Sequence, residues 1–582
     1  MCEPVRVSTG IDGLDRILKG GLVIPTISDN DCNGSVILLK GKPGTGKSTL
    51  ALQIADAINH SDPFMATDRG EISGKPDVFY YSCEQSKKDI VDKCKTLELI
   101  REDKSEGYPY FEIETFEDDK KAHRASPDFT FSKLLWVYKI ATQDKLAKRR
   151  VRLAVIDGLN LLQSKEREKF ELEELLAYLR RYTFFSILVY DDDNLYADSM
   201  VDMILELEGK DVTLNNPTPM TYFINRMRIT KSRLQKTALG WQQYKIREKW
   251  VKKDDHPNNG NQRDRERACA DKTGIIVFPS FHNRVSSNLV PQSNNLMLDQ
   301  LDESFKSFRV IENSEIPNNA GGQGEKPEDN GFFFPKIFGT TLKRGACTVI
   351  LGNRRTLKSI IGMDFLRSGA ASGSQSLLIT LIDDISTTVG QKYPCFWPFT
   401  SEGKVIVQPM TADRIAEINN SIFPYYFQPG CITSDEFFYY LEKRLDNKNI
   451  NYAAFWDLTQ IEYKFPFLAN DPTFLTGLIN LFKQKNEKRE PVNSLIMGAP
   501  YCKLAKSAYE MADNAVFCWR EPDNSVFVFS ERIGGSLDEN RLFRLRHKEK
   551  YISYQQIDST SQEGRKAERE VNQIIAKMVN KV

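Results

Sequence analysis

The sequence lacks an apolar run long enough to cross a membrane, and it lacks paired metal ligands. Its 10 cysteines stand singly with no CxxC motif, which excludes zinc-finger and dithiol redox spacings and favours reduced, mostly buried thiols. The 5 histidines show no ligand spacing either, and nothing indicates a nucleophilic triad. A span would need about 18 apolar residues, and the N-terminus has no charged-then-apolar signal pattern. We therefore expect a cytoplasmic protein with no membrane partner.

Neither sign of charge is in excess. There are 80 Lys plus Arg and 79 Asp plus Glu, which argues against a surface that is wholly a nucleic-acid footprint and leaves only local basic patches open. The balance of 40% hydrophobic and 27% charged residues is that of an ordinary globular chain. At 582 residues the chain exceeds one core, and about 150 residues per domain gives two to four domains.

The first half alternates short apolar runs with helical segments. The run Ser35 to Leu39 is typical of a buried strand, and Leu50, Ile54 and Ile58 then repeat at helical spacing. Three further runs alternate with helices in the same way: 78–81, 153–156 and 186–190. This alternation predicts a parallel α/β sheet with helices on its faces. The later runs, with little helix between them, predict an antiparallel extension at the sheet edge. They are 203–207, 222–229, 242–246 and 274–279.

A change of composition marks a domain boundary. From about Ser286 to Asn330 the sequence is rich in Asn, Ser, Gly, Glu and Pro, as linkers are. Beyond it the order of strand, loop and helix begins again at Thr348, so we expect a distant internal duplication. The predicted organisation is a first domain, a linker, a second domain and a tail with a helix. Their bounds are 1–286, 287–330, 331–550 and 551–582.

A phosphate-binding loop follows the first strand at once. It has the form GxxxxGK[ST] and reads Gly41, Lys42, Pro43, Gly44, Thr45, Gly46, Lys47 and Ser48. Glycines let successive backbone amides point into one concavity, where they and the helix N-terminus bind phosphate oxygens. Lys47 supplies a mobile positive charge and Ser48 is positioned to hold Mg²⁺. The flanking strand and helix make a chance glycine turn a poor alternative, so we expect bound ATP with Mg²⁺.

Two acidic residues stand at strand ends beside this loop. Asp157 ends the run at 153–156 and fits the carboxylate that reaches the metal, with a solvated turn as the bland alternative. Glu84 follows the run at 78–81, on the edge where phosphates should lie, and fits the group that orients or deprotonates the attacking water. The alternative to a catalytic role is that Glu84 merely lies next to the N-cap of the following helix.

Several motifs together resemble the opening of the KaiC family of RecA-like ATPases. They are Ser8 to Asp15, Leu18, Gly20 to Leu22, Gly34-Ser35 and the loop itself. Cys83-Glu84-Gln85 is similar to the acidic pair of that family. Glu84 matches the first residue of the pair as the catalytic glutamate, whereas Gln85 replaces the second acidic residue. The resemblance implies two tandem RecA-like P-loop domains, each a mostly parallel sheet flanked by helices. It also implies catalysis by Glu84, Lys47 and Asp157, and a metal at Ser48 and Asp157.

The resemblance extends to nucleotide contacts and assembly. It places ATP on the loop residues Gly41, Pro43, Gly44, Thr45, Gly46, Lys47, Ser48 and Thr49. Ile229 to Arg233 resembles the Lys-x-Arg strand whose basic residues reach the nucleotide of a neighbouring subunit, which implies a homo-oligomeric ring, a hexamer in that family. Lys231 and Arg233, two apart on a strand, point to the same side. A solvated basic edge is the alternative.

The corresponding loop of the second half is degenerate. It runs from Gly352 to Ser359, with Arg355 and Leu357 where the first loop has glycines. Because these side chains disfavour the backbone angles that glycine permits, we expect phosphate binding to be lost or much weakened. Three features still echo a working site: Lys358-Ser359, Ile382 to Asp384 and Phe455 to Asp457. We interpret this half as a pseudo-ATPase that builds the ring or holds a protein effector.

Three functions fit these features. The first is an ATPase, slow in turnover, that acts as an oligomeric nucleotide-dependent switch or regulator. The second is a DNA-binding recombinase-like or helicase-like ATPase, for which the charged insertion at 247–272 offers basic residues that acidic neighbours nearly cancel. The third is a nucleotide-gated scaffold that recruits an effector with negligible turnover, favoured by Gln85 and the degenerate loop.

Overall fold

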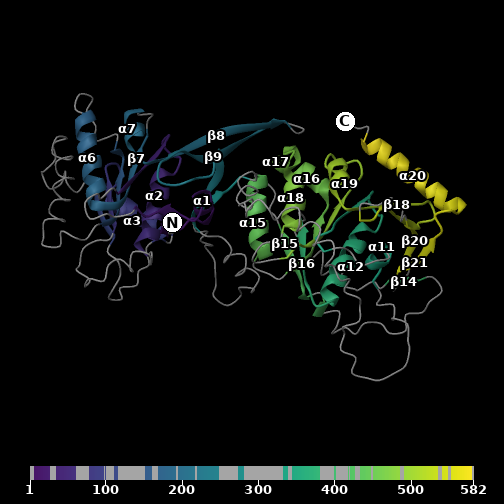
Figure 1. The fold of residues 1–582 in the computed structure, drawn as a ribbon. Coiled ribbons are helices and arrows are strands. Elements are labelled where there is room, and N and C mark those ends of the chain that lie inside the picture. The colour runs from purple at the N-terminus through teal and green to yellow at the C-terminus, as the bar shows by residue number, and fades with distance from the viewer. Residues whose placement is uncertain are drawn as a thin grey trace, which may run out of the picture. The chain divides into compact units, whose positions relative to one another are not determined.

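The computed structural model divides the chain into two compact units, Met1–Val290 and Pro291–Val582. Each unit has its own sheet and its own helices (Figure 1). The structure describes residues 5–25, 34–60, 78–97, 99, 111–115, 151–159, 168–191, 195–215, 219–247, 273–280, 332–338, 344–380, 399–401, 417–418, 420–426, 433–446, 450–484, 490–534, 541–547 and 552–579. The predicted linker at 287–330 lies outside these ranges.

The described strands of the first unit form one nine-stranded sheet and a two-stranded one. In spatial order the large sheet contains β11 (Gly274–Phe278), β10 (Gln242–Arg247), β9 (Pro219–Ser232), β8 (Met203–Asn215), β3 (Ser35–Gly41), β7 (Thr183–Tyr190), β6 (Val151–Asp157), β4 (Val78–Ser82) and β5 (Phe111–Thr115). The small sheet pairs β1 (Arg6–Val7) with β2 (Leu22–Val23). From β8 to β5 all neighbours are parallel, whereas β8 to β11 pair in antiparallel fashion. The mostly parallel α/β sheet with an antiparallel edge is confirmed.

Helices cover both faces of this sheet. They are α1 (Asp12–Ile17), α2 (Lys47–Asn59), α3 (Lys87–Thr96), α6 (Glu168–Tyr182) and α7 (Leu195–Met200). Side chains alternate between the two faces of a strand, so Ile37 and Leu39 join the core of α1, α2 and α3. Val36 and Leu38 join the core of α6 and α7 on the other side. Burial on both faces explains why these strands read as continuous apolar runs.

The β8–β9 hairpin is longer than its apolar runs indicate. Its paired residues extend from Met203 opposite Ser232 to Asn215 opposite Pro219, and the two strands project beyond the rest of the sheet (Figure 1). Ion pairs join the base of the hairpin, where β8 also pairs with β3 as far as Leu207: Arg226 lies 2.8 Å from Glu208 and Arg228 2.8 Å from Glu206. Beyond this base, residues 210–214 and 221–224 are exposed or half-buried, so no apolar run marks the extension in the sequence.

The second unit repeats this architecture. Its described strands form a ten-stranded sheet in the order β14 (Phe399–Ser401), β21 (Ile552–Ile557), β20 (Arg541–His547), β19 (Val526–Arg532), β18 (Asn514–Arg520), β12 (Cys347–Gly352), β17 (Asn493–Gly498), β16 (Ile450–Trp456), β13 (Gln375–Thr380) and β15 (Ile422–Tyr426). Its helices are α11 (Phe334–Phe338), α12 (Lys358–Ala371), α15 (Ser434–Asp446), α16 (Leu458–Lys464), α17 (Pro466–Asn470), α18 (Phe474–Lys483), α19 (Ala505–Met511) and α20 (Gln562–Val579). Strands β18 to β15 are parallel. The sheet continues past residue 550 into β21.

One contact shows the duplication at residue level. Just before β8, Asp202 accepts a hydrogen bond from the backbone N–H of Val36 at 3.0 Å. Just before β18, Asp513 accepts one from the N–H of Cys347 at 2.8 Å. Each aspartate also pairs with a basic residue at a helix end, Arg180 in one unit and Lys483 in the other. No described helix is both long and apolar enough to cross a bilayer.

Candidate nucleotide-binding site

The phosphate-binding loop connects β3 to α2 as its sequence predicts. Gly44 and Gly46 have φ angles of 82° and 86°, in the left-handed region where a side chain is strained. A Cβ on Gly46 would also lie 2.6 Å from Cδ1 of Ile246. Thr45 closes the turn, because its hydroxyl donates to the carbonyl of Lys42 at 2.8 Å. The glycines therefore stand where the backbone requires them.

Lys47 lies inside the loop with its side chain only 5% exposed. Its ammonium group donates to the carbonyls of Gly41 at 2.7 Å and Lys42 at 2.9 Å. It also forms an ion pair with Asp191 at 2.6 Å. Sequence reasoning missed Asp191, although an aspartate directly after the buried strand β7 was a signal of the same kind as Asp157.

Asp157 ends β6 and is 2% exposed. Ser48 donates to its Oδ1 at 3.1 Å, and the hydroxyl of Tyr80 donates to its Oδ2 at 2.6 Å. Burial raises the pKa of Asp157, and the two hydroxyl donors oppose that rise. The structure thus brings Ser48 and Asp157 together, and Tyr80 holds the other oxygen of the carboxylate.

Glu84 lies next to the end of the same strand. A Cβ on Gly158 would lie 2.8 Å from Cγ of Glu84, and the backbone N–H of Cys83 donates to the carbonyl of Asp157 at 2.8 Å. Desolvation raises the pKa of Glu84, the charges of Asp191 and Asp157 raise it further, and Lys47 lowers it. Carboxylates at three different strand ends therefore interact with the charge of Lys47, and that of Asp191 contacts it directly.

The side chains at this edge fit a magnesium nucleotide. Hydroxyl and carboxylate oxygens, the groups of Ser48 and Asp157, are ligands that Mg²⁺ prefers. Within the described ranges no group of three or more His, Cys, Asp or Glu residues is arranged to hold a metal. A metal here would therefore take further ligands from the nucleotide, as is usual for Mg²⁺ at phosphate sites. Pro43 is exposed in the loop and Thr49 is buried in α2.

Lys231 and Arg233 lie side by side at the end of β9. Both donate to the carbonyl of Ser199 at the end of α7, at 3.0 and 2.8 Å, and Lys231 also donates to that of Asp198 at 2.5 Å. Desolvation and the charge of Arg233 lower the pKa of Lys231. Within the described residues, the side-chain hydrogen bonds of Lys231 and Arg233 go to carbonyls in α7. The side chain of Arg233 is 52% exposed.

The second loop keeps the backbone of a P-loop without its glycines. Arg355 and Leu357 have φ angles of 66° and 59°, close to those of Gly44 and Gly46. The hydroxyl of Thr356 donates to the carbonyl of Asn353 at 2.8 Å, as Thr45 does in the first loop. Lys358 donates to Gly352 and Gly498 at 2.6 and 3.2 Å. The angles that these side chains disfavour are nevertheless adopted, because the flanking strand and helix impose them.

The sheet register corrects one match made from the sequence. The two sheets can be aligned on the first residues of the loops, Gly41 and Gly352. When the strand pairing is followed from there to β6 in the first sheet and to β16 in the second, Trp456 takes the position of Asp157. Asp457 stands at the position of Gly158 and shares its positive φ, 73° against 87°. The Asp457 side chain accepts a hydrogen bond from the N–H of Thr459 at 3.0 Å and caps α16. The second unit therefore has Trp456, and no carboxylate, at the position that Asp157 takes in the first.

The register also identifies a counterpart of Lys231 in the second unit. Arg532 pairs with Ala515 at a bulge, as Lys231 pairs with Ile204 at a bulge of the first sheet. Arg532 thus takes the position of Lys231, rather than that of Arg233. Its guanidinium donates to the carbonyl of Tyr509 in α19, which parallels the contacts of Lys231 with α7. The predicted acidic pair at 382–384 and the insertion at 248–272 lie outside the described residues.

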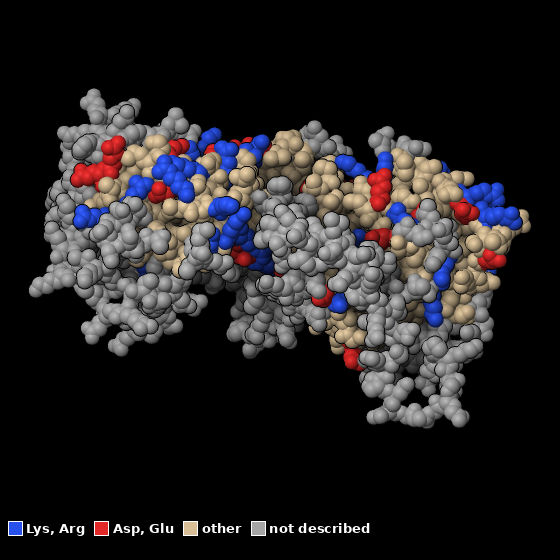
Figure 2. Space-filling model, viewed as in Figure 1, with Lys and Arg blue, Asp and Glu red and all other residues tan. Residues whose placement is uncertain are grey.

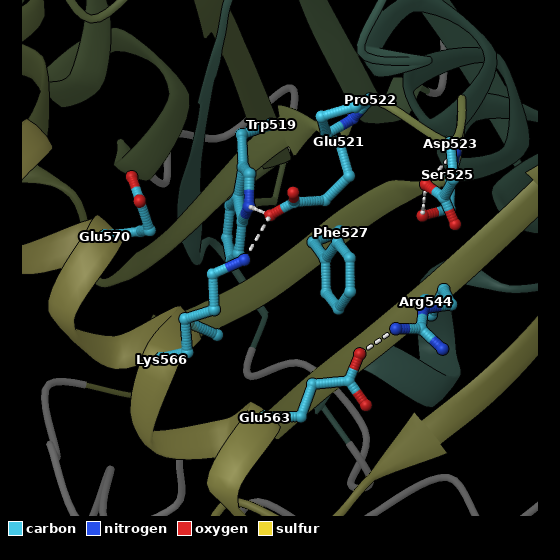
Figure 3. Close-up of a pocket in the computed structure, with 11 residues that line it drawn as sticks. Trp519, Glu521, Pro522, Asp523, Ser525, Phe527, Arg544, Glu563, Lys566 and Glu570 are labelled. Carbon is cyan, nitrogen blue, oxygen red and sulfur yellow. Dashed lines mark hydrogen bonds and ion pairs between the residues drawn. The ribbon is translucent and has the colours of Figure 1, made fainter.

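A separate pocket of about 270 Å³ lies in the second unit under α20 (Figure 3). Trp519 and Phe527 stack on its wall with ring centroids 5.4 Å apart. Two ion pairs tie the helix to the sheet, one between Lys566 and Glu521 at 3.6 Å and one between Glu563 and Arg544. With Val571 and Met578 of α20 buried, the terminal helix is packed rather than loose.

Comparison with known proteins agrees with the geometry of the first unit. Residues 7–255 match the family model described as ATPase: KaiC. A DNA repair protein RadA of Aquifex aeolicus is 38% identical over 100 residues, which are 17% of this chain and 17% of that protein. That of Rickettsia typhi is 52% identical over 52 residues, 9% of this chain and 10% of that protein. The match with the RadA of Mycobacterium tuberculosis strain H37Rv is 55% over 47 residues, 8% of each.

The chain thus spans far less than two thirds of the length of these relatives. The matched family model nevertheless includes all four candidate site residues, Lys47, Ser48, Glu84 and Asp157. The second unit repeats the fold with a degenerate loop. Residues 7–255 form a KaiC-like ATPase domain of the RecA superfamily of P-loop ATPases.

Proposed function

We propose that this protein binds ATP with Mg²⁺ at residues 41–48, hydrolyses it slowly and acts in the cytoplasm as an oligomeric nucleotide-dependent switch. The observation that carries the proposal is the meeting of Lys47, Ser48, Asp157 and Glu84 at one sheet edge, with Ser48 3.1 Å from Asp157. Lys47 binds phosphate oxygens, and Ser48 and Asp157 hold the metal. Bound Mg²⁺ neutralises phosphate charge. Glu84 orients the attacking water and accepts its proton.

The test of catalysis replaces Lys47 by Ala. Loss of one preorganised contact to the reacting phosphates costs on the order of 100-fold in rate, so the K47A ATPase rate should fall at least that far. Lys358 is the matched control, because it occupies the same loop position in the second unit and donates to Gly352 in the same way. An undiminished rate in K47A, or an equal fall in K358A, contradicts the assignment.

We propose a homo-oligomeric ring in which Lys231 and Arg233 of one subunit reach the nucleotide of the next. The support is their shared position at the end of β9 and the exposure of Arg233, at 52%. Light scattering with and without ATP tests this. Assembly should depend on ATP in the wild type and weaken in R233A, whereas ATP-independent scattering argues against a nucleotide-driven ring. ATP-dependent assembly with negligible turnover favours instead a scaffold that holds an effector through the second unit.

A DNA-acting ATPase is the second candidate. The matched relatives are named DNA repair proteins, and Arg226 and Arg228 both stack over Trp241 at 4.4 Å, an arrangement of cations and an aromatic ring that nucleic acids also engage. On the face in Figure 2, however, described basic and acidic side chains are interspersed. Affinity for single- or double-stranded DNA that rises steeply as salt falls supports this candidate. Salt-independent or absent binding rejects it.

A further inference from the structure

The ammonium group of Lys47 has no donor left for a ligand. A lysine carries three N–H donors, and those of Lys47 face the carbonyls of Gly41 and Lys42 and the carboxylate of Asp191. The two carbonyls belong to the loop that Lys47 itself closes. Asp191 belongs to another element, the end of β7, and is the only charged member of the three. A phosphate oxygen can therefore reach Lys47 only by displacing one of these partners.

Asp191 is the partner that an anion displaces most readily. Its side chain is 25% exposed, against 5% for Lys47, so the carboxylate can turn into water without leaving a buried charge. It also lies close enough to Glu84 to repel that carboxylate. A phosphate that arrives here meets a negative charge already paired with the lysine that should bind it.

We propose that Asp191 is an internal competitor of the nucleotide phosphates for Lys47. Resting on the proposed function, this inference assigns to Asp191 the setting of nucleotide affinity. The ion pair at 2.6 Å holds the nucleotide-free site closed, and it opens when phosphate takes over the third donor of Lys47. Asp191 is a positioning residue in this role, because it acts through Lys47.

The second unit supports the specificity of this pair. Counted along the paired strands, Ala499 stands at the position of Asp191. Without a carboxylate there, Lys358 donates instead to the carbonyl of Gly498, 3.2 Å away. Within the described residues, a carboxylate at this register position is therefore present beside the first loop and replaced by Ala499 beside the second.

The test is calorimetric binding of ATP and of ADP, each with Mg²⁺, to the full chain. D191N keeps the shape of the side chain and removes its charge, and D191A removes the acceptor as well. We expect both to bind nucleotide about tenfold more tightly than the wild type, the effect of one charge-assisted contact. D198N is the matched control, because Asp198 pairs with Lys40 at 2.8 Å in the same unit. It should leave affinity unchanged.

A double-mutant cycle separates competition from a general charge effect. In the K47A background D191N should have no effect, since the group for which Asp191 competes is gone. Equal or weaker binding by D191N, with the wild type binding normally, overturns this inference and leaves the proposed function intact. Tighter binding that persists in K47A also overturns it. If neither wild type nor D191N binds, both proposals fail.

Discussion

Both oxygens of the Asp157 carboxylate are held by hydroxyl groups, and only one of them was foreseeable. Ser48 belongs to the phosphate-binding motif, whereas Tyr80 lies within β4 and is fully buried. Tyr80 is the second hydrogen-bond partner of the carboxylate that we propose as a metal ligand, and it therefore orients that carboxylate. The sequence does not reveal this role of Tyr80. A tyrosine within an apolar run fits a buried strand, and only the pairing of strands in the sheet determines which group its hydroxyl contacts.

The variant Y80F should weaken Mg²⁺-dependent nucleotide binding about tenfold, the effect of losing an outer partner of a metal ligand. The measurement is nucleotide affinity across a Mg²⁺ titration, in which the midpoint should move to higher Mg²⁺. Y81F is the control, because Tyr81 is also buried on β4 but faces the core of α6. A midpoint that moves equally in both variants would point to lost stability alone.

Backbone strain in the second loop gives a prediction at the same scale. Arg355 is exposed and has a φ of 66°, which costs a residue with a side chain on the order of 1 kcal/mol more than glycine. R355G should therefore raise the free energy of unfolding by up to about 1 kcal/mol. Chemical denaturation measures this.

Arg354 provides the comparison. It is exposed beside Arg355 but is not among the residues with positive φ. R354G should lower the free energy of unfolding by roughly 0.5 to 1 kcal/mol. Glycine relieves no strain at this position and only increases the conformational freedom of the unfolded chain. Two variants that change stability in the same direction would contradict the argument from strain.

At the scale of elements, one buried carboxylate ties α11 to α12. Asp364 accepts hydrogen bonds from the backbone N–H groups of Phe333 and Phe334 at 2.8 and 2.7 Å. Burial raises its pKa to about 7, while those two bonds and the charge of Arg367 oppose the rise. The two phenylalanines lie in the core of the second unit, so the two bonds hold the N-terminal end of α11 to α12.

This raised pKa predicts how stability depends on pH. The folded state holds the Asp364 proton more tightly than the unfolded state, whose pKa is near 3.8. The resulting stabilisation is full below about pH 4 and is lost as pH rises through about 7, by up to about 4 kcal/mol. Urea unfolding at pH 5 and pH 8 should show the loss in the wild type and not in D364N. D523N, an exposed carboxylate, should behave as the wild type.

The elements themselves were largely predictable. Strands buried on both faces, such as β3 and β6, give continuous apolar runs, and α2 repeats Leu50, Ile54 and Ile58 at helical spacing. The long β8–β9 hairpin was underestimated, since its outer residues 210–214 and 221–224 are exposed or half-buried and give no apolar run. The strand β21 was placed in the tail, because Ile552, Tyr554 and Ile557 alternate only weakly with polar residues.

For the whole molecule, the two units predict one nucleotide per chain. The first has Lys47, Asp157 and loop glycines, and the second has Trp456 at the metal position and side chains in place of those glycines. Calorimetry should give a stoichiometry of one, with the affinity of that single site weakened in K47A and unchanged in K358A. A stoichiometry of two, or a loss of binding in K358A, would show that the second loop still binds nucleotide.

The sequence by itself determined the first loop, its strand and helix, and the duplication, because these depend on local glycine spacing and on apolar periodicity. The tertiary structure decided what the loop faces. Asp191, Tyr80 and Asp157 come from three strands, and only sheet register brings them to Lys47 and Ser48. Register also moved Asp457 away from the metal position. A one-residue shift along a strand reverses the direction of a side chain, and local sequence does not fix it.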